Sequence, residues 1–324
     1  KIVVKLHKME RFEPRKFITK KTQALHSFAS EKGIIVAVSG GIDSIVCFEI
    51  ALAATAKSNE KPIPLMLETG LLRVNEVKKT EEYFRKQYGI ELQKWEVQDR
   101  FLLALKGIST PEEKRKTFRE VFYKTMGQAL RSYSAEVLVQ GTILPDVIET
   151  QRGIKIHFNV LQEAGIDPQN YGILLFEPIK ELTKSRTKML ARSFSLPPKL
   201  LKTQPFPGIG FAARITGEIT IDRIEKIRAA TSIVESELAD PKIFQCFPVL
   251  FIDKVTGIQN DTAILGDIIA IKAVESKDSL TAKPFNISWM KIEKITKRIL
   301  NEVPGIVRVV YDFTPKPPGT IEFV

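Results

Sequence analysis

The sequence predicts an α/β protein with a doubly wound, mostly parallel sheet, followed by a smaller C-terminal α+β domain. First, a strand-like β-branched run at 34–38, a Gly-rich turn and a helix-like run at 45–57 follow one another. Second, strand and helix patterns keep alternating to about residue 176, which is typical of a parallel sheet. Third, a segment dense in Pro and Gly at 197–210 interrupts this pattern. We therefore expect a domain boundary near residue 203, with domains at 1–202 and 203–324.

The expected elements can be followed in order along the chain. In the first domain, strands at 64–67, 92–97, 136–142 and 173–176 alternate with helices at 76–88 and 111–133. Pro111 suits the first turn of its helix, where a missing N–H costs nothing. In the second domain we expect helices at 221–238 and 288–302 and strands at 247–252, 267–274 and 307–313.

Composition limits the class of protein. The chain has 324 residues, 44% of them hydrophobic and 27% charged, which is ordinary for a soluble globular protein. It has no apolar run of membrane-spanning length and no secretory signal, so we expect a cytoplasmic protein without a membrane partner. Met9 resembles a natural start, which leaves open whether residues 1–8 are native. Cys47 and Cys246 lie in apolar surroundings and are expected to be reduced core residues.

The net charge of +11 indicates an anionic partner or simply a Lys-rich, solvated surface. The basic residues are spread along the chain without a block, and aromatic residues do not alternate with them. This distribution argues against nucleic acid as the partner, which leaves a nucleotide or an acidic protein as the alternatives for an anionic partner.

The SGGIDS run at 39–44 predicts a phosphate-binding loop between a strand and a helix. Gly40 and Gly41 let the backbone approach an anion, and the helix after Ile42 directs free N–H groups towards it. Ser39 and Ser44 add hydroxyl donors, and Asp43 could hold Mg²⁺ against the phosphate oxygens. The alternative is a Gly-rich turn without a ligand, and the loop is not a Walker A motif because it lacks Gly-Lys-Ser/Thr.

Two further turns are expected at the same edge of the sheet. Gly70 follows the second strand, and Gly141-Thr142 follows the strand at 136–142. Because ligands of parallel sheets bind at the carboxyl ends of the strands, these residues are candidates for the same ligand site as the SGGIDS loop.

Several motifs together resemble the ATP-pyrophosphatase part of GMP synthase, from about Met9 to the C-terminus. They are SGGIDS at 39–44, GLLRVNE at 70–76, PEEKRK at 111–116, QGTILPDVIE at 140–149, PFPG at 205–208, GE at 217–218, NEV at 301–303, RVVYD at 308–312 and KPPGTIE at 316–322. The resemblance implies the fold of the PP-loop ATP pyrophosphatases, which is similar to that of the adenine nucleotide α-hydrolases.

The resemblance also implies a reaction and its partners. ATP adenylates the C2 oxygen of XMP, and ammonia then displaces AMP, which leaves GMP and pyrophosphate. The chain shows no glutaminase domain, so ammonia is expected from solution or from a separate glutamine amidotransferase subunit. The second domain of the family commonly forms homodimers, and ATP and Mg²⁺ are the expected cofactors.

Site residues can be carried over by position. Lys155 falls where the family has a lid lysine, and the resemblance implies that it stabilises the adenylation transition state. His157 is a candidate for supporting lid closure or proton transfer, and a purely structural role is the alternative. Asp146 and Glu149, just past a strand end, are candidates for orienting Mg²⁺ or the lid, with a solvated turn as the alternative. The residues that match the XMP-binding segments are Arg214, Gln259, Lys316, Ile321 and Glu322.

The chain departs from the family pattern near these sites. The departures are Glu68, Arg119, Phe158, Thr203, Ile209, Asn260 and Lys272. They keep two other interpretations open: a paralogue that adenylates another nucleotide or base carbonyl, and a catalytically silent nucleotide-binding partner.

Overall fold

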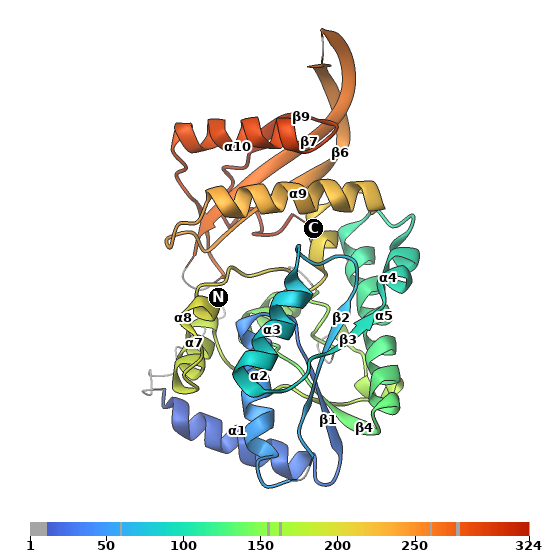
Figure 1. The fold of residues 1–324 in the computed structure, drawn as a ribbon, viewed down its shortest axis with the longest axis vertical. Coiled ribbons are helices and arrows are strands. Elements are labelled where there is room, and N and C mark those ends of the chain that lie inside the picture. Colours follow the sequence, from blue (N-terminus) through green and yellow to red (C-terminus); the bar gives the residue numbers. More distant parts are fainter. Residues whose placement is uncertain are drawn as a thin grey trace.

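The computed structural model describes residues 12–58, 60–153, 156–161, 164–259, 261–276 and 279–323. Two sheets lie one above the other along the long axis of the molecule, the N-terminal sheet below and the C-terminal sheet above (Figure 1). No helix in these residues is long and apolar enough to cross a membrane.

The N-terminal sheet has five parallel strands in the order β3-β2-β1-β4-β5. The strands are β1 (Gly33–Ala37), β2 (Ile63–Glu68), β3 (Gln93–Glu96), β4 (Ala135–Val139) and β5 (Leu174–Phe176). The chain runs outward in one direction from β1 to β3 and then returns past β1 to β4 and β5. This confirms the predicted doubly wound sheet, and it places the point where the direction reverses at the carboxyl ends of β1 and β4.

Helices cover both faces of this sheet, and side chains of β1 alternate between the two layers. Ile34 and Val36 belong to a buried cluster with residues of α1 (Pro14–Phe28), α2 (Ile42–Ala54), α3 (Glu76–Tyr88) and α7 (Lys184–Ser193). Ile35 points to the other face, where its cluster includes residues of α4 (Gln98–Leu105) and α5 (Pro111–Ser132). The shorter helical segments among the described residues are α6 (Leu144–Gln151), η2 (Pro168–Tyr171), α8 (Pro198–Leu201) and, beyond residue 203, η3 (Gly210–Arg214).

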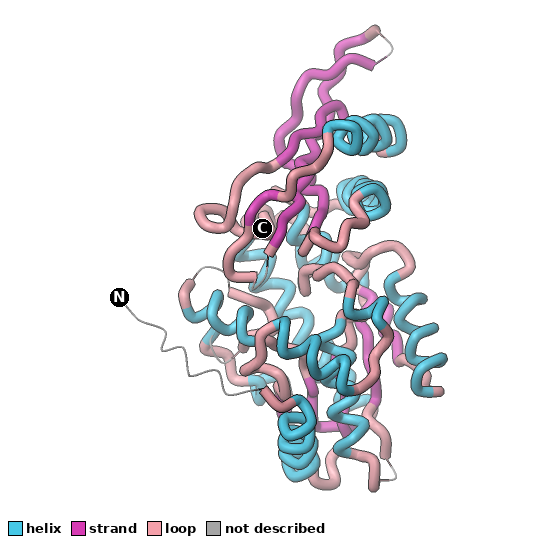
Figure 2. The backbone as a smooth tube through the Cα atoms, turned by 90° about the vertical axis from the view of Figure 1, so that its left-hand side faces the viewer, coloured by secondary structure: helices cyan, strands magenta, loops and turns pink. Residues whose placement is uncertain are grey.

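The C-terminal sheet is built on one long antiparallel hairpin of β6 (Gln245–Gln259) and β7 (Thr262–Glu275). The short β8 (Lys283–Pro284) pairs antiparallel with β7, and β9 (Ile306–Tyr311) pairs parallel with β7. Helices α9 (Ile221–Glu237) and α10 (Trp289–Glu302) lie side by side against this sheet, and the hairpin projects beyond the rest of the chain (Figures 1 and 2). The strands expected at 247–252 and 267–274 are thus the inner parts of two longer strands.

The hydrophobic core continues across the predicted boundary at residue 203. One buried cluster joins residues of α4 and α5 to residues of α9, α10 and the C-terminal sheet. Phe211 donates its backbone N–H to the carbonyl of Leu71 at 2.8 Å, and an added Cβ on Gly210 would lie 2.3 Å from that same oxygen. The boundary therefore separates two sheets that share one core, and two separate domains remain a prediction.

Candidate active site

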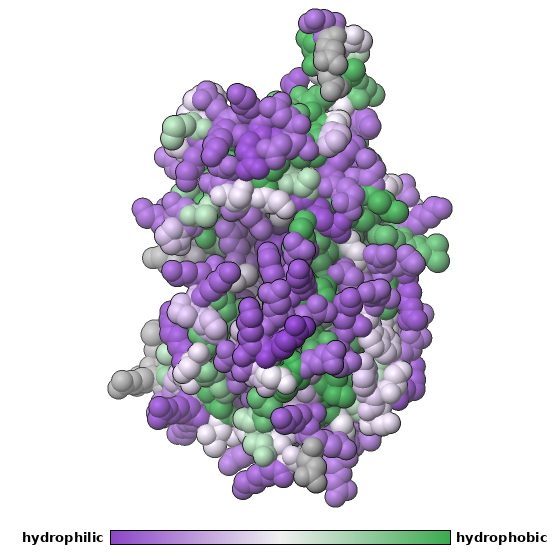
Figure 3. Space-filling view, in the orientation of Figure 1, coloured by the Kyte–Doolittle hydropathy of each residue, from purple (hydrophilic) through white to green (hydrophobic). Residues whose placement is uncertain are grey.

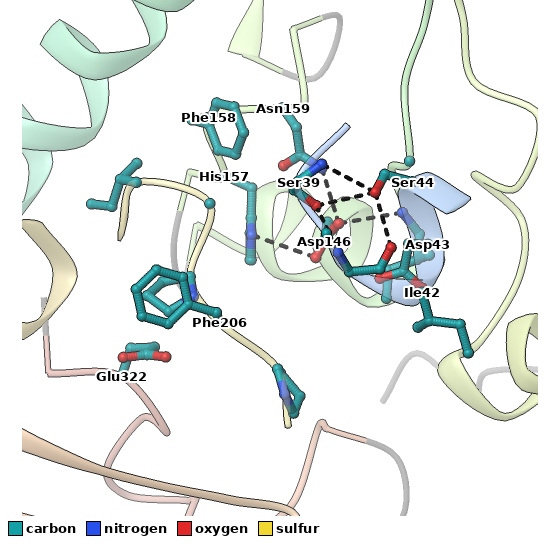
Figure 4. Close-up of a pocket in the computed structure, with 18 of the residues that line it drawn as sticks. Ser39, Ile42, Asp43, Ser44, Asp146, His157, Phe158, Asn159, Phe206 and Glu322 are labelled. Carbon is teal, nitrogen blue, oxygen red and sulfur yellow. Dashed lines mark hydrogen bonds and ion pairs between the residues drawn. The ribbon is translucent and has the colours of Figure 1, made fainter. Parts of the chain in front are cut away.

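A cavity of about 370 Å³ lies between the carboxyl ends of the N-terminal strands and the C-terminal tail. The close-up in Figure 4 shows the phosphate loop and the 157–159 segment on one side, and Phe206 and Glu322 on the other. The predicted site residues that line it are Ser39, Gly40, Gly41, Ile42, Asp43, Ser44, Gly141, His157, Lys316, Ile321 and Glu322. The fold thus brings the predicted ATP loop and the predicted XMP tail to one space.

The phosphate loop has the geometry that its sequence predicts. Gly40 has φ 74°, and a Cβ there would lie 2.8 Å from the hydroxyl of Thr80, so both conformation and space favour glycine. Ser44 donates its hydroxyl hydrogen to the carbonyl of Gly41 at 2.9 Å, which closes the turn. Helix α2 begins at Ile42, three residues earlier than expected, so its free N–H groups lie directly at the loop.

The two carboxylate oxygens of Asp43 have different surroundings. Lys184, in the first turn of α7, donates to Oδ2 at 2.6 Å. Oδ1 is buried and has no hydrogen-bond partner in the part of the chain that the structure describes. An unsatisfied carboxylate oxygen beside a phosphate loop fits a Mg²⁺ ligand. Sequence reasoning did not single out Lys184, which is 141 residues from Asp43.

Gly141 lets the loop after β4 approach the start of α2. A Cβ at this position would lie 3.0 Å from the carbonyl carbon of Asp43. Thr142, in contrast, is fully buried and does not line the cavity. Its hydroxyl donates to Glu177 and accepts from the amide of Asn159 at 3.4 Å. Thr142 therefore helps to hold the 157–159 segment from its side that faces away from the cavity.

Gly70 also lies outside the cavity lining. Its N–H donates to the Glu68 side chain at 3.0 Å, and its carbonyl accepts from Arg228 at 2.7 Å. Glu68 is one of the departures from the family pattern, and its side chain closes the turn after β2 by accepting this hydrogen bond from Gly70. The residues of this stretch that do reach the cavity are Thr69, Leu72, Arg73 and Glu76.

Glu149 connects α6, the 157–159 segment and the C-terminal tail. Its Oε2 lies 2.7 Å from His157 Nε2, and its Oε1 accepts a hydrogen bond from Lys316 Nζ. Asp146 lies on the other side of the imidazole, with Oδ1 3.5 Å from Nδ1. Burial would raise the pKa of Glu149, but the hydrogen bonds from His157 and Lys316 lower it to about 2. Lys155, the predicted lid lysine, lies outside the described residues.

Arg214 lies beneath the cavity, not in its lining. The side chain is fully buried between the rings of Phe206 and Phe247, with its guanidinium carbon 4.7 and 4.6 Å from the two centroids. Its Nε lies 3.7 Å from Glu322 Oε2, and none of its three side-chain nitrogens has a hydrogen-bond partner among the described residues. Arg214 can therefore act on a ligand only by way of Glu322 or after a rearrangement.

Gln259 ends β6 at the tip of the projecting hairpin (Figure 1). Its backbone pairs with Thr262 across the turn, and the tip points away from the rest of the molecule. Within this chain, the structure does not bring Gln259 together with the other predicted XMP residues.

Two of the described departures from the family pattern are accommodated by packing or by an ion pair. Phe158 packs edge to face against Phe118 and Phe122, at centroid distances of 5.4 and 5.2 Å. Lys272 is buried and donates to Asp312 at 2.6 Å. Thr203 lines the cavity, whereas Asn260 is outside the described residues. Sequence reasoning missed the aromatic side of the cavity because its members come from separate segments: Phe118, Phe122, Phe158 and Phe206.

The chain is similar to known proteins over nearly its whole length. The profile of the family "GMP synthase C terminal domain" matches residues 232–323. The B-type subunit of the glutamine-hydrolyzing GMP synthase of Archaeoglobus fulgidus is 41% identical over 95% of this chain and 98% of its own length. The corresponding proteins of Methanocaldococcus jannaschii and Pyrococcus abyssi are each 39% identical, over 96% and 95% of this chain and 99% and 98% of their own lengths. Among solved structures, the NMN synthetase of Francisella tularensis has a TM-score of 0.46 and 18% identity, over 61% of this chain and 78% of that chain.

Proposed function

Because this chain belongs to the family of B-type subunits of glutamine-hydrolyzing GMP synthase, we propose that it is the ligase that converts XMP to GMP with ATP and ammonia. The observation that carries this proposal is the shared cavity. The SGGIDS loop lines one part of it, and Lys316, Ile321 and Glu322 line another. One space therefore holds both candidate nucleotide sites, as direct adenylation of one nucleotide by another requires.

For ATP, we propose that the pyrophosphate lies on the N–H groups of the phosphate loop and α2. Lys184 would share its charge between Asp43 and the phosphates, since it already lies 2.6 Å from Asp43. Asp43 Oδ1 is the proposed ligand of Mg²⁺, which when bound would neutralise charge on the pyrophosphate. The apolar lining formed by Met66, Leu67, Phe118, Phe122 and Met126 provides a surface on which a purine base can pack.

For XMP, we propose that the 5′-phosphate takes Lys316 away from Glu149. The ammonium and the carboxylate satisfy each other in the absence of a ligand, and a phosphate carries more charge than the carboxylate. Glu322, which accepts a hydrogen bond from Gln245 at 2.7 Å, is placed to recognise the ribose or the base. Gln259 would reach an XMP site only through a neighbouring copy of the chain.

The proposed chemistry has two steps. The C2 oxygen of XMP attacks the α-phosphorus of ATP, and the P–O bond to pyrophosphate breaks. Ammonia then attacks C2, the C2–O bond breaks with its electrons on AMP, and the new nitrogen loses a proton. Lys155 is proposed to stabilise charge at the α-phosphate, and His157, held by Glu149 and Asp146, to fix the segment beside it.

The family works with a separate amidotransferase partner, since its members are one of the subunits of a glutamine-hydrolyzing enzyme. We further propose a homodimer formed through the projecting hairpin, where Ile258 and Leu265 are 79% and 67% exposed. Hydrophobic side chains are visible on this hairpin in the space-filling view (Figure 3). A cytoplasmic location would keep Cys47 and Cys246, both free and buried, reduced.

Product analysis tests the proposal. The protein is mixed with ATP, Mg²⁺, XMP and ammonium chloride, and GMP, AMP and pyrophosphate are quantified. We expect equal amounts of the three products, and loss of all three in Lys155→Ala and Asp43→Asn. ATP turnover with no GMP, or GMP formation that survives both substitutions, would contradict the proposed reaction or the proposed site.

A further inference from the structure

Lys114 on α5 is a fully buried lysine outside the cavity lining. Its Nζ donates to the backbone carbonyl of Ile215 at 2.6 Å, and in the described chain it forms no ion pair with a carboxylate. Burial, and to a lesser extent the charge of Arg223, lower the pKa of Lys114 to about 8. An apolar side chain would fill this space without the cost of burying an ammonium group, so the lysine is expected to have a role beyond packing.

The backbone carbonyl that accepts from Lys114 belongs to the segment that directly follows η3. Ile215 is the C-cap of η3, where helical carbonyls lack partners within the helix. Arg223, on α9, donates to the carbonyls of Thr216 at 2.8 Å and Glu218 at 2.6 Å. Two cations, one on each side of the predicted boundary, therefore fix the backbone at 215–218.

Arg214 directly precedes this fixed backbone. Its guanidinium is fully buried between Phe206 and Phe247, and its Nε lies 3.7 Å from Glu322 in the cavity lining. A side chain packed between two rings cannot compensate for a backbone shift by changing rotamer. The position of the Ile215 carbonyl therefore sets the position of Arg214 under Glu322.

We propose that Lys114 is a positioning residue for XMP binding, which holds Ile215 and thereby keeps Arg214 in place beneath Glu322. This inference rests on the proposed function, because it takes XMP as the ligand next to Glu322. Lys114 itself contacts neither nucleotide site.

The role predicts a pH dependence of XMP affinity. Arg223 is the charged group whose field acts on Lys114, and its positive charge disfavours the protonated lysine. The folded-state pKa of about 8 lies below the ordinary 10.5, so the ammonium loses its proton as the pH rises through about 8. A neutral amine donates a weaker hydrogen bond than an ammonium. XMP affinity should therefore fall across this range, while ATP affinity should not follow it.

The experiment measures XMP and ATP dissociation constants by calorimetry on both sides of pH 8, without ammonia. Lys114→Met removes the donor and its charge, and Lys116→Met is the matched control, since Lys116 is exposed on the same helix. We expect Lys114→Met to weaken XMP binding about tenfold, as for one lost charge-assisted hydrogen bond. It should leave ATP binding unchanged and remove the pH step, and Lys116→Met should behave like the wild type.

Three results would overturn the role of Lys114: unchanged XMP affinity in Lys114→Met, an equal loss for XMP and ATP, or the same pH step in the variant. If Lys114→Met does not fold, the wild-type profile decides, because XMP affinity that is flat through pH 8 contradicts the inference. Failure of the wild type to bind XMP would instead contradict the proposed function. GMP formation by the wild type, together with unchanged affinity in the variant, contradicts only the inference.

Discussion

The carboxylates around the cavity differ in whether other residues of the protein supply hydrogen-bond partners for their oxygens. Asp43 leaves one buried oxygen without a partner among the described residues, as expected of a group that waits for a ligand. Glu149 is the opposite case, because His157 and Lys316 occupy both of its oxygens. In the absence of a ligand, Glu149 is therefore a structural carboxylate, and its loss should affect stability as well as catalysis.

Replacing Glu149 by Gln should destabilise the protein by about 1–3 kcal/mol at neutral pH, because the side chain loses its negative charge and one of the two oxygens that accept from His157 and Lys316. The folded pKa of about 2 lies below the ordinary 4.5. The stabilisation is therefore present above pH 4.5 and is lost as the pH falls towards 2. Urea unfolding at neutral and acidic pH should show a difference between wild type and variant that shrinks on acidification. Glu136→Gln, at an exposed position, is the control, and a pH-independent difference would count against this account.

For single residues, the sequence predicts sites whose members are neighbours in the chain. The phosphate loop could be predicted because its glycines, hydroxyls and carboxylate are consecutive, and the structure places all of them at the cavity. The Lys184–Asp43 and Lys316–Glu149 pairs join residues 141 and 167 positions apart. Only the completed fold brings them together, so local patterns could not indicate either pair.

Among the elements, the loop at 205–211 is the junction of the site. It contacts the turn after β2 through the hydrogen bond from Phe211 to Leu71, and β6 through the bond from Gln245 to the Pro205 carbonyl at 3.2 Å. Its Gly208 lies under Phe158 of the 157–159 segment. Movement of that segment should therefore be transmitted to the loop.

Gly208→Ala tests this junction. The added Cβ would lie 1.9 Å from Cε1 of Phe158, so either the ring or the loop must move. We expect a loss of about 1–3 kcal/mol in stability and weaker binding of both nucleotides. Phe158→Ala loses packing against Phe118 and Phe122, yet it provides room for the new methyl group. In a double-mutant cycle measured by thermal unfolding, the two losses should be less than additive. Simple additivity would show that the segment and the loop are independent.

Most of the helices and strands expected from the sequence lie within a few residues of the observed bounds, whereas the full length of the β6–β7 hairpin was not predicted. The helix expected at 76–88 has those bounds in α3, and Pro111 begins α5 as expected. The outer half of the hairpin was missed because it is not buried on either face, as exposed Ile258 and Leu265 indicate. Its stability within one chain comes from pairing between β6 and β7, which local hydrophobicity does not encode.

At the scale of the whole molecule, the two sheets are joined by contacts of several kinds. Arg228 on α9 donates to the carbonyls of Gly70 and Leu72, Lys114 donates to Ile215, and Lys316 binds Glu149. The largest buried cluster also crosses residue 203. The Pro/Gly-rich segment that suggested a boundary thus lies between a parallel sheet and a mostly antiparallel one, but the hydrophobic core continues across it.

We therefore expect the chain to unfold in one cooperative transition. Removing either half would expose part of the shared cluster and leave Lys114 and Arg228 without their carbonyl partners, so neither half should be stable alone. Calorimetry of the full chain should give one peak whose van't Hoff and calorimetric enthalpies agree. A fragment that ends at residue 202 should lack a cooperative transition. Two separate peaks, or a fragment that folds and binds ATP, would show that the predicted boundary divides two independent folding units. XMP and ATP would then be expected to stabilise different peaks, whereas a shared core requires that each nucleotide raises the single melting temperature.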